Sequence, residues 1–562
     1  MPPHRRPTWY GAHPAGPTVD RVRVTVVSGL AVAAVLALVA PAAPPAAAAP
    51  AGAGDTLTVG VLDLPLGLNP NTAADAGQPA LDATAAVLPS VFPAGRLRPR
   101  LNRSLFAGAA VTSTAPFTVT YLVRPQAIWS DGVPLGYSDF ALAWRAQSGR
   151  TGGVTHAVST DGYRDIRTVT GAATAAGRRI TVVFAKPYIE WRSLFSSMLP
   201  AHVVTLGEWD NAVSVNLPPL SAGPYAVAAT QTPGTLTLVR NLRYPGRRAA
   251  IARIVFRQYP SRSALVGALR RGAVQLVVPA TNPEDELPLR GLPGVRAVPV
   301  RSVFYEHLDF NLHDPVAGDP VVRHAVARAV DDEAVARAAS AAYGGAPAQV
   351  TGGRLLQPGQ PGYADQRGPD GHGDTVGARA LLTAAGWAPG ADGVFARAGL
   401  RAAFTLVTTA GNRLRTAEAE ALRAQLAPAG IEVTLRYEPA DRLFAALPRH
   451  RFQATLFGWV GSPATVSALG PVVRTRGSGN YGGLADPRVD VELERAARAL
   501  SDGGEQAALR ATERLLWLDA ATVPLVERPI LVAASRRLHG VTASPTLDGI
   551  FATAGRWRLD RS

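Results

Sequence analysis

The sequence contains no cysteine and only one lysine, Lys186. A chain without cysteine forms no disulfide bond and no thiolate metal site. The HExxH, GxxxxGK[ST] and nucleophile-elbow signatures of enzymes are absent as well. No local group of serine, histidine and aspartate residues pairs a nucleophile with a base. We therefore expect a protein that is not an enzyme and that carries no cofactor.

Arginine supplies almost all of the positive charge. Lysine and arginine number 57 against 42 acidic residues, which gives a formal net charge of +15. Such a balance is found in nucleic-acid-binding proteins, but here the arginines are scattered and form no long basic run. Arginine in place of lysine, with abundant alanine, glycine and proline, is typical of GC-rich coding. We expect no nucleic-acid partner, and the charge favours attraction to an anionic envelope or ligand.

Residues 1–54 differ in composition from the rest of the chain. Basic residues precede the uncharged apolar run 24–40, and a segment of mostly alanine, proline and glycine follows it. This order is typical of an export signal, with cleavage expected near 46–49. An uncleaved membrane anchor is the alternative, because the run is only slightly shorter than a full span. Arg5 and Arg6 lie too far from the run for a twin-arginine signal. No other stretch is apolar enough to span a bilayer.

The remaining chain is too long for one hydrophobic core and predicts two or three domains. Its most informative stretch is 117–143. Apolar and polar residues alternate over 117–123, which predicts a half-buried strand. The sequence WSDG at 129–132 predicts a tight turn, since glycine tolerates positive φ. Ser138 is then expected to cap a helix whose first residue is Asp139. Further helices are predicted over 188–199, ending at Pro200, and over 507–521.

This unit resembles the strand, WSDG, proline and helix signature of the extracellular solute-binding proteins of family 5. These are the oligopeptide, dipeptide and nickel-binding proteins of ABC transporters. Further short matches follow in the same order along the chain, nearly to its end. They are LNP at 68–70, LPAH at 199–202, SAGPY at 221–225, Asn241 with Tyr244, Phe310 with Asn311, Arg323 and Asp331, PGY at 361–363, LLTAAGW at 381–387, Asn480 with Tyr481, Asp486, Pro487 and Asp490, and VPL at 523–525.

The resemblance implies an α/β fold of the type II periplasmic-binding-protein class, with two lobes and an extra N-terminal subdomain. The domain boundaries that follow are 1–54 for the signal or anchor with its linker, 55–95 with 215–298 and 530–562 for the discontinuous lobe I, 96–214 for the additional subdomain, and 299–529 for lobe II. Within lobe II, strands are predicted over 404–408 and 431–437, separated by a helix over 416–426. This β–α–β order predicts parallel pairing of the two strands.

The resemblance also implies a ligand site between the two lobes. The candidate ligand-binding residues are Trp459, Ser462, Asn480, Tyr481, Tyr305, His307 and Arg474. Trp459 and Tyr481 are aromatic wall residues or, alternatively, core residues. Tyr305 and His307 alternate on one predicted strand and are expected to face the same cleft. Arg474 is a candidate for receiving a carboxylate, with an exposed surface arginine as the alternative.

One departure from the family pattern bears on the ligand. Oligopeptide-binding relatives have an aspartate three residues beyond the equivalent of Trp459, where it pairs with the amino terminus of the peptide. Here that position is Ser462. A neutral hydroxyl does not replace a charge opposite a buried ammonium. The chain therefore uses another acid, or it does not bind a free peptide amine. Smaller departures are Gln275 in place of aspartate and Asp332 in place of arginine.

Two other motifs are weak. Asp370, His372 and Asp374 offer oxygen and nitrogen ligands from a glycine-rich loop, but no helix or strand fixes their spacing. Residues 477–482 (GSGNYG) fit the GxGxxG pattern of dinucleotide sites. That motif requires a preceding strand and a helix at its end, and here the next helix is expected only at Asp486. We expect neither a metal nor a nucleotide.

The leading hypothesis is capture of a small polar solute, peptide-like or other, and its delivery to an ABC permease in the membrane. The alternative is an envelope-associated regulator or scaffold built on the same fold. Many Gram-positive relatives are tethered through a lipidated cysteine, which this sequence lacks, so we expect an exported, non-lipidated monomer. The missing cysteine and Ser462 favour the alternative, and neighbouring permease and ATPase genes would favour transport.

Overall fold

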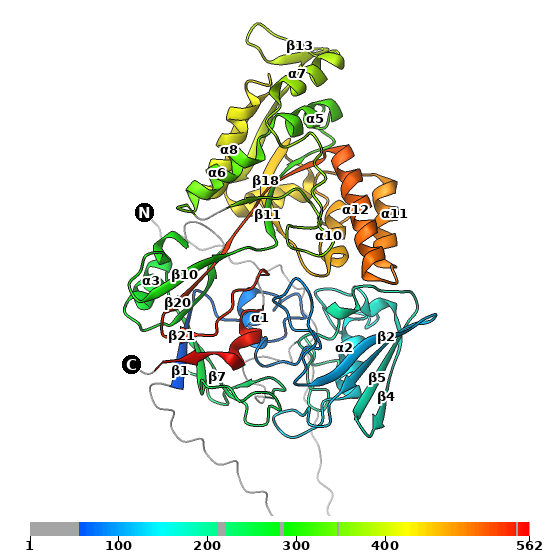
Figure 1. Cartoon of the computed structure of the whole chain (residues 1–562), viewed down its shortest axis with the longest axis vertical. Coiled ribbons are helices and arrows are strands. Elements are labelled where there is room, and N and C mark those ends of the chain that lie inside the picture. The colour runs from blue at the N-terminus through cyan, green and yellow to red at the C-terminus, as the bar shows by residue number, and fades with distance from the viewer. Residues whose placement is uncertain (1–54, 211–219, 281–285, 346–347, 547–548, 561–562) are drawn as a thin grey trace, which may run out of the picture. The chain divides into compact units, whose positions relative to one another are not determined.

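The computed structural model describes residues 55–210, 220–280, 286–345, 348–546 and 549–560 (Figure 1). Within this part of the chain, two large mixed sheets, one antiparallel sheet and two small ribbons form. The predicted signal segment 1–54, with its apolar run, lies outside the described residues.

The first large sheet has the strand order β10-β20-β9-β1-β8-β7-β6. Its strands are β1 (Thr56–Val61), β6 (Tyr225–Val227), β7 (Thr235–Arg240), β8 (Arg253–Gln258), β9 (Leu276–Ala280), β10 (Val295–Val300) and β20 (Ile530–Ser535). β1 pairs in parallel with both β8 and β9, and the other neighbours are antiparallel. Helices α1 (Gln78–Thr84) and α3 (Arg262–Arg270) belong to the same part of the chain.

The second large sheet has the order β12-β19-β11-β18-β16-β17. Its strands are β11 (Phe304–Phe310), β12 (Gln349–Val350), β16 (Ala403–Thr409), β17 (Glu432–Glu438), β18 (Ala454–Val460) and β19 (Thr522–Glu527). Its helices are α5 (Pro320–Ala329), α6 (Asp332–Ala342), α7 (Thr375–Ala384), α8 (Arg413–Leu426), α9 (Ala440–Ala446), α10 (Thr465–Val473), α11 (Pro487–Ala497) and α12 (Asp502–Asp519). The predicted parallel pairing of β16 and β17 across α8 is confirmed.

The antiparallel sheet has the order β2-β3-β5-β4 and carries helix α2 (Tyr137–Gln147). Its strands are β2 (Phe106–Thr114), β3 (Phe117–Val123), β4 (Ile166–Thr174) and β5 (Gly177–Phe184). The small ribbons are formed by β13 (Ala388–Pro389), β14 (Phe395–Arg397) and β15 (Leu400–Arg401), and by β21 (Leu538–His539) and β22 (Arg558–Leu559). Each of the three larger sheets is thus built from its own set of chain segments. The lobe boundaries given above stay a prediction.

The WSDG turn forms as predicted, but the helix after it begins earlier. The Gly132 amide donates to the Trp129 carbonyl at 2.9 Å, and Gly132 has a φ of +104°. Helix α2 begins at Tyr137, so Ser138 lies inside its first turn and does not cap it. The Asp139 carboxylate instead accepts from the Gly136 amide at 2.8 Å. The capping partner is therefore the third helical residue and not the one before the helix.

Asp139 also joins α2 to a distant part of the chain. Its second carboxylate oxygen accepts from the Ala201 amide at 3.0 Å, and its side chain is buried. We expect Asp139→Ala to lower the free energy of unfolding by about 2 kcal/mol, because it leaves two backbone donors without partners. Ser138→Ala, at an exposed position of the same turn, should change it by less than about 0.5 kcal/mol. Urea unfolding followed by fluorescence measures both, and equal losses would contradict this role for Asp139.

Other helix predictions are corrected in a similar way. The helix predicted over 188–199 is wrong, since only Trp191–Ser193 forms a short 3-10 turn. Phe195 and Ser197 have φ values of 55° and 46°, which a right-handed helix does not accommodate. Helices α8 and α12 begin at Arg413 and Asp502, before the predicted starts, because Asn412 and Ser501 cap them. In both helices a polar side chain ahead of the predicted start accepts a hydrogen bond from a backbone amide of the first turn.

Two connections link the two large sheets, one between β10 and β11 and the other between β19 and β20. Hydrogen bonds join these two connections to each other. Glu527 accepts from the Arg301 guanidinium at 2.6 Å and from the Ser302 amide at 2.9 Å. The Ser302 hydroxyl donates to the Arg528 carbonyl at 2.6 Å, and the Arg528 amide donates to the Phe304 carbonyl at 2.8 Å. These bonds hold the start of β11 next to the end of β19.

A buried ionic network, formed by Glu306, Arg415, Arg528 and Glu418, adjoins this junction. Glu306 is fully buried and accepts from Arg415 and from Arg528, each at 2.9 Å. Burial opposes its charge, but the two arginines hold the Glu306 pKa below its ordinary value. Glu418 is buried beside it, and burial together with the Glu306 charge raises the Glu418 pKa well above its ordinary value. Both effects favour the neutral form of Glu418.

Candidate functional site

The predicted site begins on one face of the second large sheet. β11 and β18 pair antiparallel, with Tyr305 opposite Trp459 and His307 opposite Phe457. Because side chains alternate along a strand, these four residues lie on the same face of the sheet. The predicted alternation of Tyr305 and His307 is thus confirmed, and it brings both beside Trp459.

An aromatic cluster forms here from His307, Phe457, Trp459 and Tyr481. The Trp459 ring stacks on Tyr481 with centroids 5.8 Å apart, and it lies parallel to the His307 ring at 6.3 Å. Phe457 packs edge-on against both His307 and Trp459. Trp459 and Tyr481 are half-buried, whereas His307 is fully buried. Half-buried aromatic rings can form the wall of a solute site.

Three polar atoms around this cluster are buried and have no hydrogen-bond partner among the described residues. They are His307 Nε2, Thr455 Oγ1 and Trp459 Nε1. His307 Nδ1 lies 2.9 Å from Asp309 Oδ1, and a carboxylate only accepts, so Nδ1 carries the proton. Nε2 is then an acceptor, while the indole Nε1 is a donor. The face therefore offers an acceptor, a donor and a hydroxyl that no described residue uses.

Arg354 is a fourth unusual group in this region, and no sequence pattern singles it out. It is 2% exposed, and its three guanidinium nitrogens have no hydrogen-bond partner among the described residues. Its guanidinium lies 4.5 Å from the Trp517 ring centroid, and burial lowers its pKa to about 10. The Tyr305 hydroxyl donates to its backbone carbonyl at 2.6 Å. No short motif surrounds Arg354, so only the fold brings it close to Tyr305.

The other predicted site residues have structural partners. The Asn480 amide donates to the Arg474 and Leu484 carbonyls at 3.0 and 2.7 Å, and its oxygen accepts from two backbone amides. Asn480 therefore holds its own loop together. The Ser462 hydroxyl accepts from the Ala464 amide at 3.1 Å, just before α10. Arg474 follows the end of α10 and is half-buried. Ligand contacts of these three residues stay a prediction.

A carboxylate from a distant segment occupies the start of α10. Glu190 accepts from the Val466 amide at 2.6 Å, from the Ser467 amide at 3.0 Å and from the Ser467 hydroxyl. The Tyr188 hydroxyl lies 2.9 Å from the Ser467 hydroxyl. This contact, which we call the Glu190 contact, gives partners to two of the backbone amides that a helix N-terminus leaves without intrahelical partners. It lies within a few residues of Ser462, where oligopeptide-binding relatives carry an aspartate.

The Asp370, His372 and Asp374 loop serves the fold. Asp370 pairs with Arg328 at 3.1 Å, and Asp374 caps α7 by accepting from the Gly377 amide at 2.7 Å. His372 forms a β-bridge with Asp331. Over the residues that the structure describes, no group of three or more histidine, aspartate or glutamate side chains is placed to hold a metal ion.

Comparison with known proteins identifies the family. The model of the bacterial extracellular solute-binding proteins, family 5 (middle region), matches residues 100–480, more than half of the chain. The chain belongs to this family. The resemblance drawn from the sequence is thus confirmed, and this family 5 solute-binding protein acts outside the cytoplasm. Within the described residues, no helix has both the length and the apolar character needed to cross a membrane.

Two curated relatives and one solved structure extend the comparison. The oligopeptide-binding protein OppA of Mycobacterium tuberculosis is 27% identical over 465 residues, which cover 82% of this chain and 77% of OppA. The probable monoacyl phosphatidylinositol tetramannoside-binding protein LpqW of the same species is 28% identical over 478 residues, covering 82% of this chain and 71% of LpqW. The structure of the periplasmic EDTA-binding protein EppA matches with a TM-score of 0.80 at 24% identity, covering 91% of this chain and 97% of EppA. The predicted α/β, type II fold class is confirmed.

Proposed function

We propose that this family 5 protein captures a small polar solute at the aromatic cluster and presents it to an ABC permease. The observation that carries the proposal is the combination of stacked rings with unused polar atoms on one sheet face. Rings supply apolar contact area, and a few polar atoms fix the orientation of a solute. The relatives are named for binding an oligopeptide and a mannosylated lipid, so peptides and glycans are the first solutes to test.

The polar atoms favour a particular solute chemistry. A solute that donates to His307 Nε2 and accepts from Trp459 Nε1 would satisfy both atoms. A peptide bond has one donor and one acceptor, and so does a pair of sugar hydroxyls. A positively charged amine is less suited, because Ser462 replaces the acid and the Glu190 carboxylate already serves α10. We therefore expect recognition through neutral polar groups.

A screen by thermal shift tests the proposal. Peptides, oligosaccharides and lipid headgroups are added separately to the protein, and a bound solute should raise the melting temperature by mass action. If no class of solute gives a response from a folded protein, solute capture is contradicted. The second candidate, an envelope regulator or scaffold, would then be favoured by Ser462, which lacks the charge that holds a peptide amine.

Trp459→Ala should abolish the solute-induced shift, because the substitution removes the ring between His307 and Tyr481. The melting temperature without solute should change by only a few degrees, since Trp459 is half-buried. Trp144→Ala is the matched control, because Trp144 lies on α2, is also half-buried, and has an indole N–H without a partner among the described residues. A solute response that survives Trp459→Ala would show that the site lies elsewhere.

A further inference from the structure

The described part of the chain also contains a cavity of about 860 Å³. Its walls come from three segments, within 85–105, 223–247 and 542–556. Figure 1 shows the last of these, the red 3-10 turn Phe551–Arg556, beside α1 in blue. The volume falls in the range of sites for small molecules. No residue of the aromatic cluster contributes to its walls.

The lining of this cavity is strongly basic. Six arginines contribute to it, namely Arg96, Arg98, Arg100, Arg103, Arg247 and Arg556. The described lining contains no aspartate or glutamate. All six side chains are exposed, and none takes part in an ion pair found among the described residues. Four of the six fall within the eight residues 96–103 (RLRPRLNR), a local concentration that the overall scatter of arginine concealed.

The backbone around these arginines is held in place. Gly95 and Gly549 have φ values of +92° and +95°, and a Cβ built on Gly549 would lie 2.4 Å from the Gly95 Cα. Only glycine permits so close an approach of two backbones. The Asn102 amide donates to the Val91 carbonyl at 2.9 Å, and the Asn102 oxygen accepts from the Ser104 amide at 3.3 Å. The arginine segment is therefore attached both to the C-terminal segment and to the chain before it.

Other groups around the cavity are polar but neutral. Ser90, Tyr244, Ser544 and Thr553 line it together with the arginines. Burial raises the pKa of Tyr244, so its phenol stays neutral and able to donate. Nothing in the described lining neutralises the positive charge, and like charges around one space repel one another. A negatively charged occupant removes this repulsion.

We propose that this cavity binds a small, multiply charged anion that bears phosphate or carboxylate groups. The arginine guanidinium fits either group through paired hydrogen bonds. Several guanidinium groups around one space match an anion with more than one charge better than a single carboxylate. The anion is either a free solute or the headgroup of an anionic lipid, since both present the same chemistry. The proposal does not depend on solute capture at the aromatic cluster, because the two sites share no residue.

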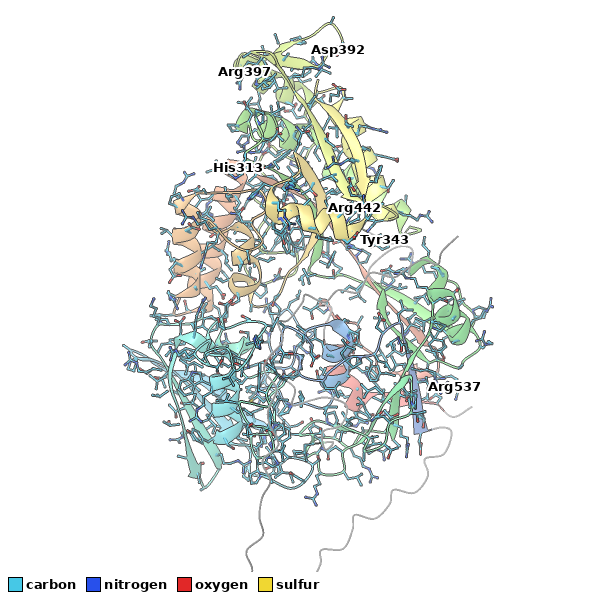
Figure 2. The ribbon with its side chains drawn as sticks, turned by 180° about the vertical axis from the view of Figure 1, so that it is seen from behind. His313, Tyr343, Asp392, Arg397, Arg442 and Arg537 are labelled. Carbon is cyan, nitrogen blue, oxygen red and sulfur yellow. The ribbon has the colours of Figure 1, made fainter. Side chains whose placement is uncertain are left out.

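The test is isothermal titration calorimetry of the full chain with sodium pyrophosphate and with sodium citrate, at low and at high salt. In parallel, sedimentation measures binding to phosphatidylcholine vesicles with and without phosphatidylinositol. The cavity variant is Arg98→Gln, Arg100→Gln and Arg247→Gln together. The control variant is Arg167→Gln, Arg270→Gln and Arg442→Gln, which removes the same charge from exposed positions outside the cavity. Arg442 is labelled in Figure 2.

We expect one or more of these anions to bind and the cavity variant to weaken binding by about tenfold or more. The control variant should weaken binding by less than about threefold. Loss with pyrophosphate or citrate indicates a free solute, and loss confined to phosphatidylinositol vesicles indicates a lipid headgroup. Equal losses in both variants would overturn the proposal, and so would absence of binding to every probe. Trp459→Ala should leave anion binding unchanged, which separates this result from failure of the aromatic site.

Discussion

Arg528→Leu should lower the free energy of unfolding by about 3–5 kcal/mol. Arg528 is 3% exposed and donates to the Glu306 carboxylate at 2.9 Å inside the protein. Its removal leaves Glu306 with Arg415 as its remaining arginine partner and takes away the 2.9 Å donor of one carboxylate oxygen, and a buried carboxylate that loses a charged donor is strongly destabilised. The substitution also removes the contact of the guanidinium with the Phe304 ring, 4.4 Å away, and the 3.2 Å hydrogen bond to the Tyr343 hydroxyl. Tyr343 is labelled in Figure 2.

Two further variants make this prediction specific. Arg495→Leu removes an exposed arginine whose nearest carboxylate, on Glu492, is 3.5 Å away, and should cost less than about 1 kcal/mol. Glu418→Gln should have little effect on stability, because the raised pKa of Glu418 favours its neutral form, which glutamine resembles. Chemical unfolding monitored by fluorescence measures all three. Similar values for Arg528→Leu and Arg495→Leu would show that the Glu306 network contributes little to stability.

Glu190→Ala should release the Glu190 contact and expose the first turn of α10. The substitution leaves the Val466 and Ser467 amides without the carboxylate that now accepts from them. Each unsatisfied buried donor costs about 1–3 kcal/mol. Hydrogen exchange of these two amides should therefore become faster by about tenfold or more. Unchanged exchange would show that the helix start is protected without Glu190.

The Glu190 contact should also depend on pH. Burial raises the Glu190 pKa to about 7, and the donors from Ser467 and Val466 offset this only in part. When the contact opens, the pKa returns toward the ordinary 4.5 of an exposed glutamate. Closing the contact therefore takes up a proton at pH values between these two. The contact is favoured at low pH and weakens as the pH rises through about 7.

Hydrogen exchange at pH 5.5 and pH 8, corrected for the intrinsic rate, measures this linkage. Protection of Val466 should be greater at the lower pH in the native protein and should lose its pH dependence in Glu190→Gln. Arg192→Gln serves as the control, because Arg192 pairs with the exposed Asp502 at 3.1 Å in the same region. A pH dependence that persists in Glu190→Gln would assign the titration to another group, such as Glu505, whose pKa is raised to about 8 by burial and by Glu190.

The sequence predicted those parts of the fold that depend on local patterns. The β–α–β unit around α8 and the WSDG turn follow from alternation and turn chemistry, and both are confirmed. The prediction of a helix over 188–199 was wrong, because the Glu190 side chain accepts hydrogen bonds from the start of α10, which is far away in the sequence. Local periodicity carries no information about such a partner.

The candidate site was predictable only in part, for the same reason. Trp459 and Tyr481 were selected from their positions in family motifs, and the structure stacks them. Asn480 was selected on the same basis, but its amide serves its own loop. Arg354 belongs to no motif. It is unusual because its buried guanidinium has no hydrogen-bond partner among the described residues, and only the tertiary structure shows this. The arginine cavity likewise gathers residues from three distant segments.

The order of strands in the first large sheet sets the order in which the molecule is completed during synthesis. β20, at Ile530–Ser535, pairs with both β9 and β10. Until the ribosome has made more than 500 residues, β9 therefore has only β1 as a neighbour and β10 lacks its partner strand. The second large sheet draws only on residues between Phe304 and Glu527 and is complete before that. The half of the protein that starts first thus finishes last, and β9 and β10 remain as open edges that nascent chains and chaperones can reach in the meantime.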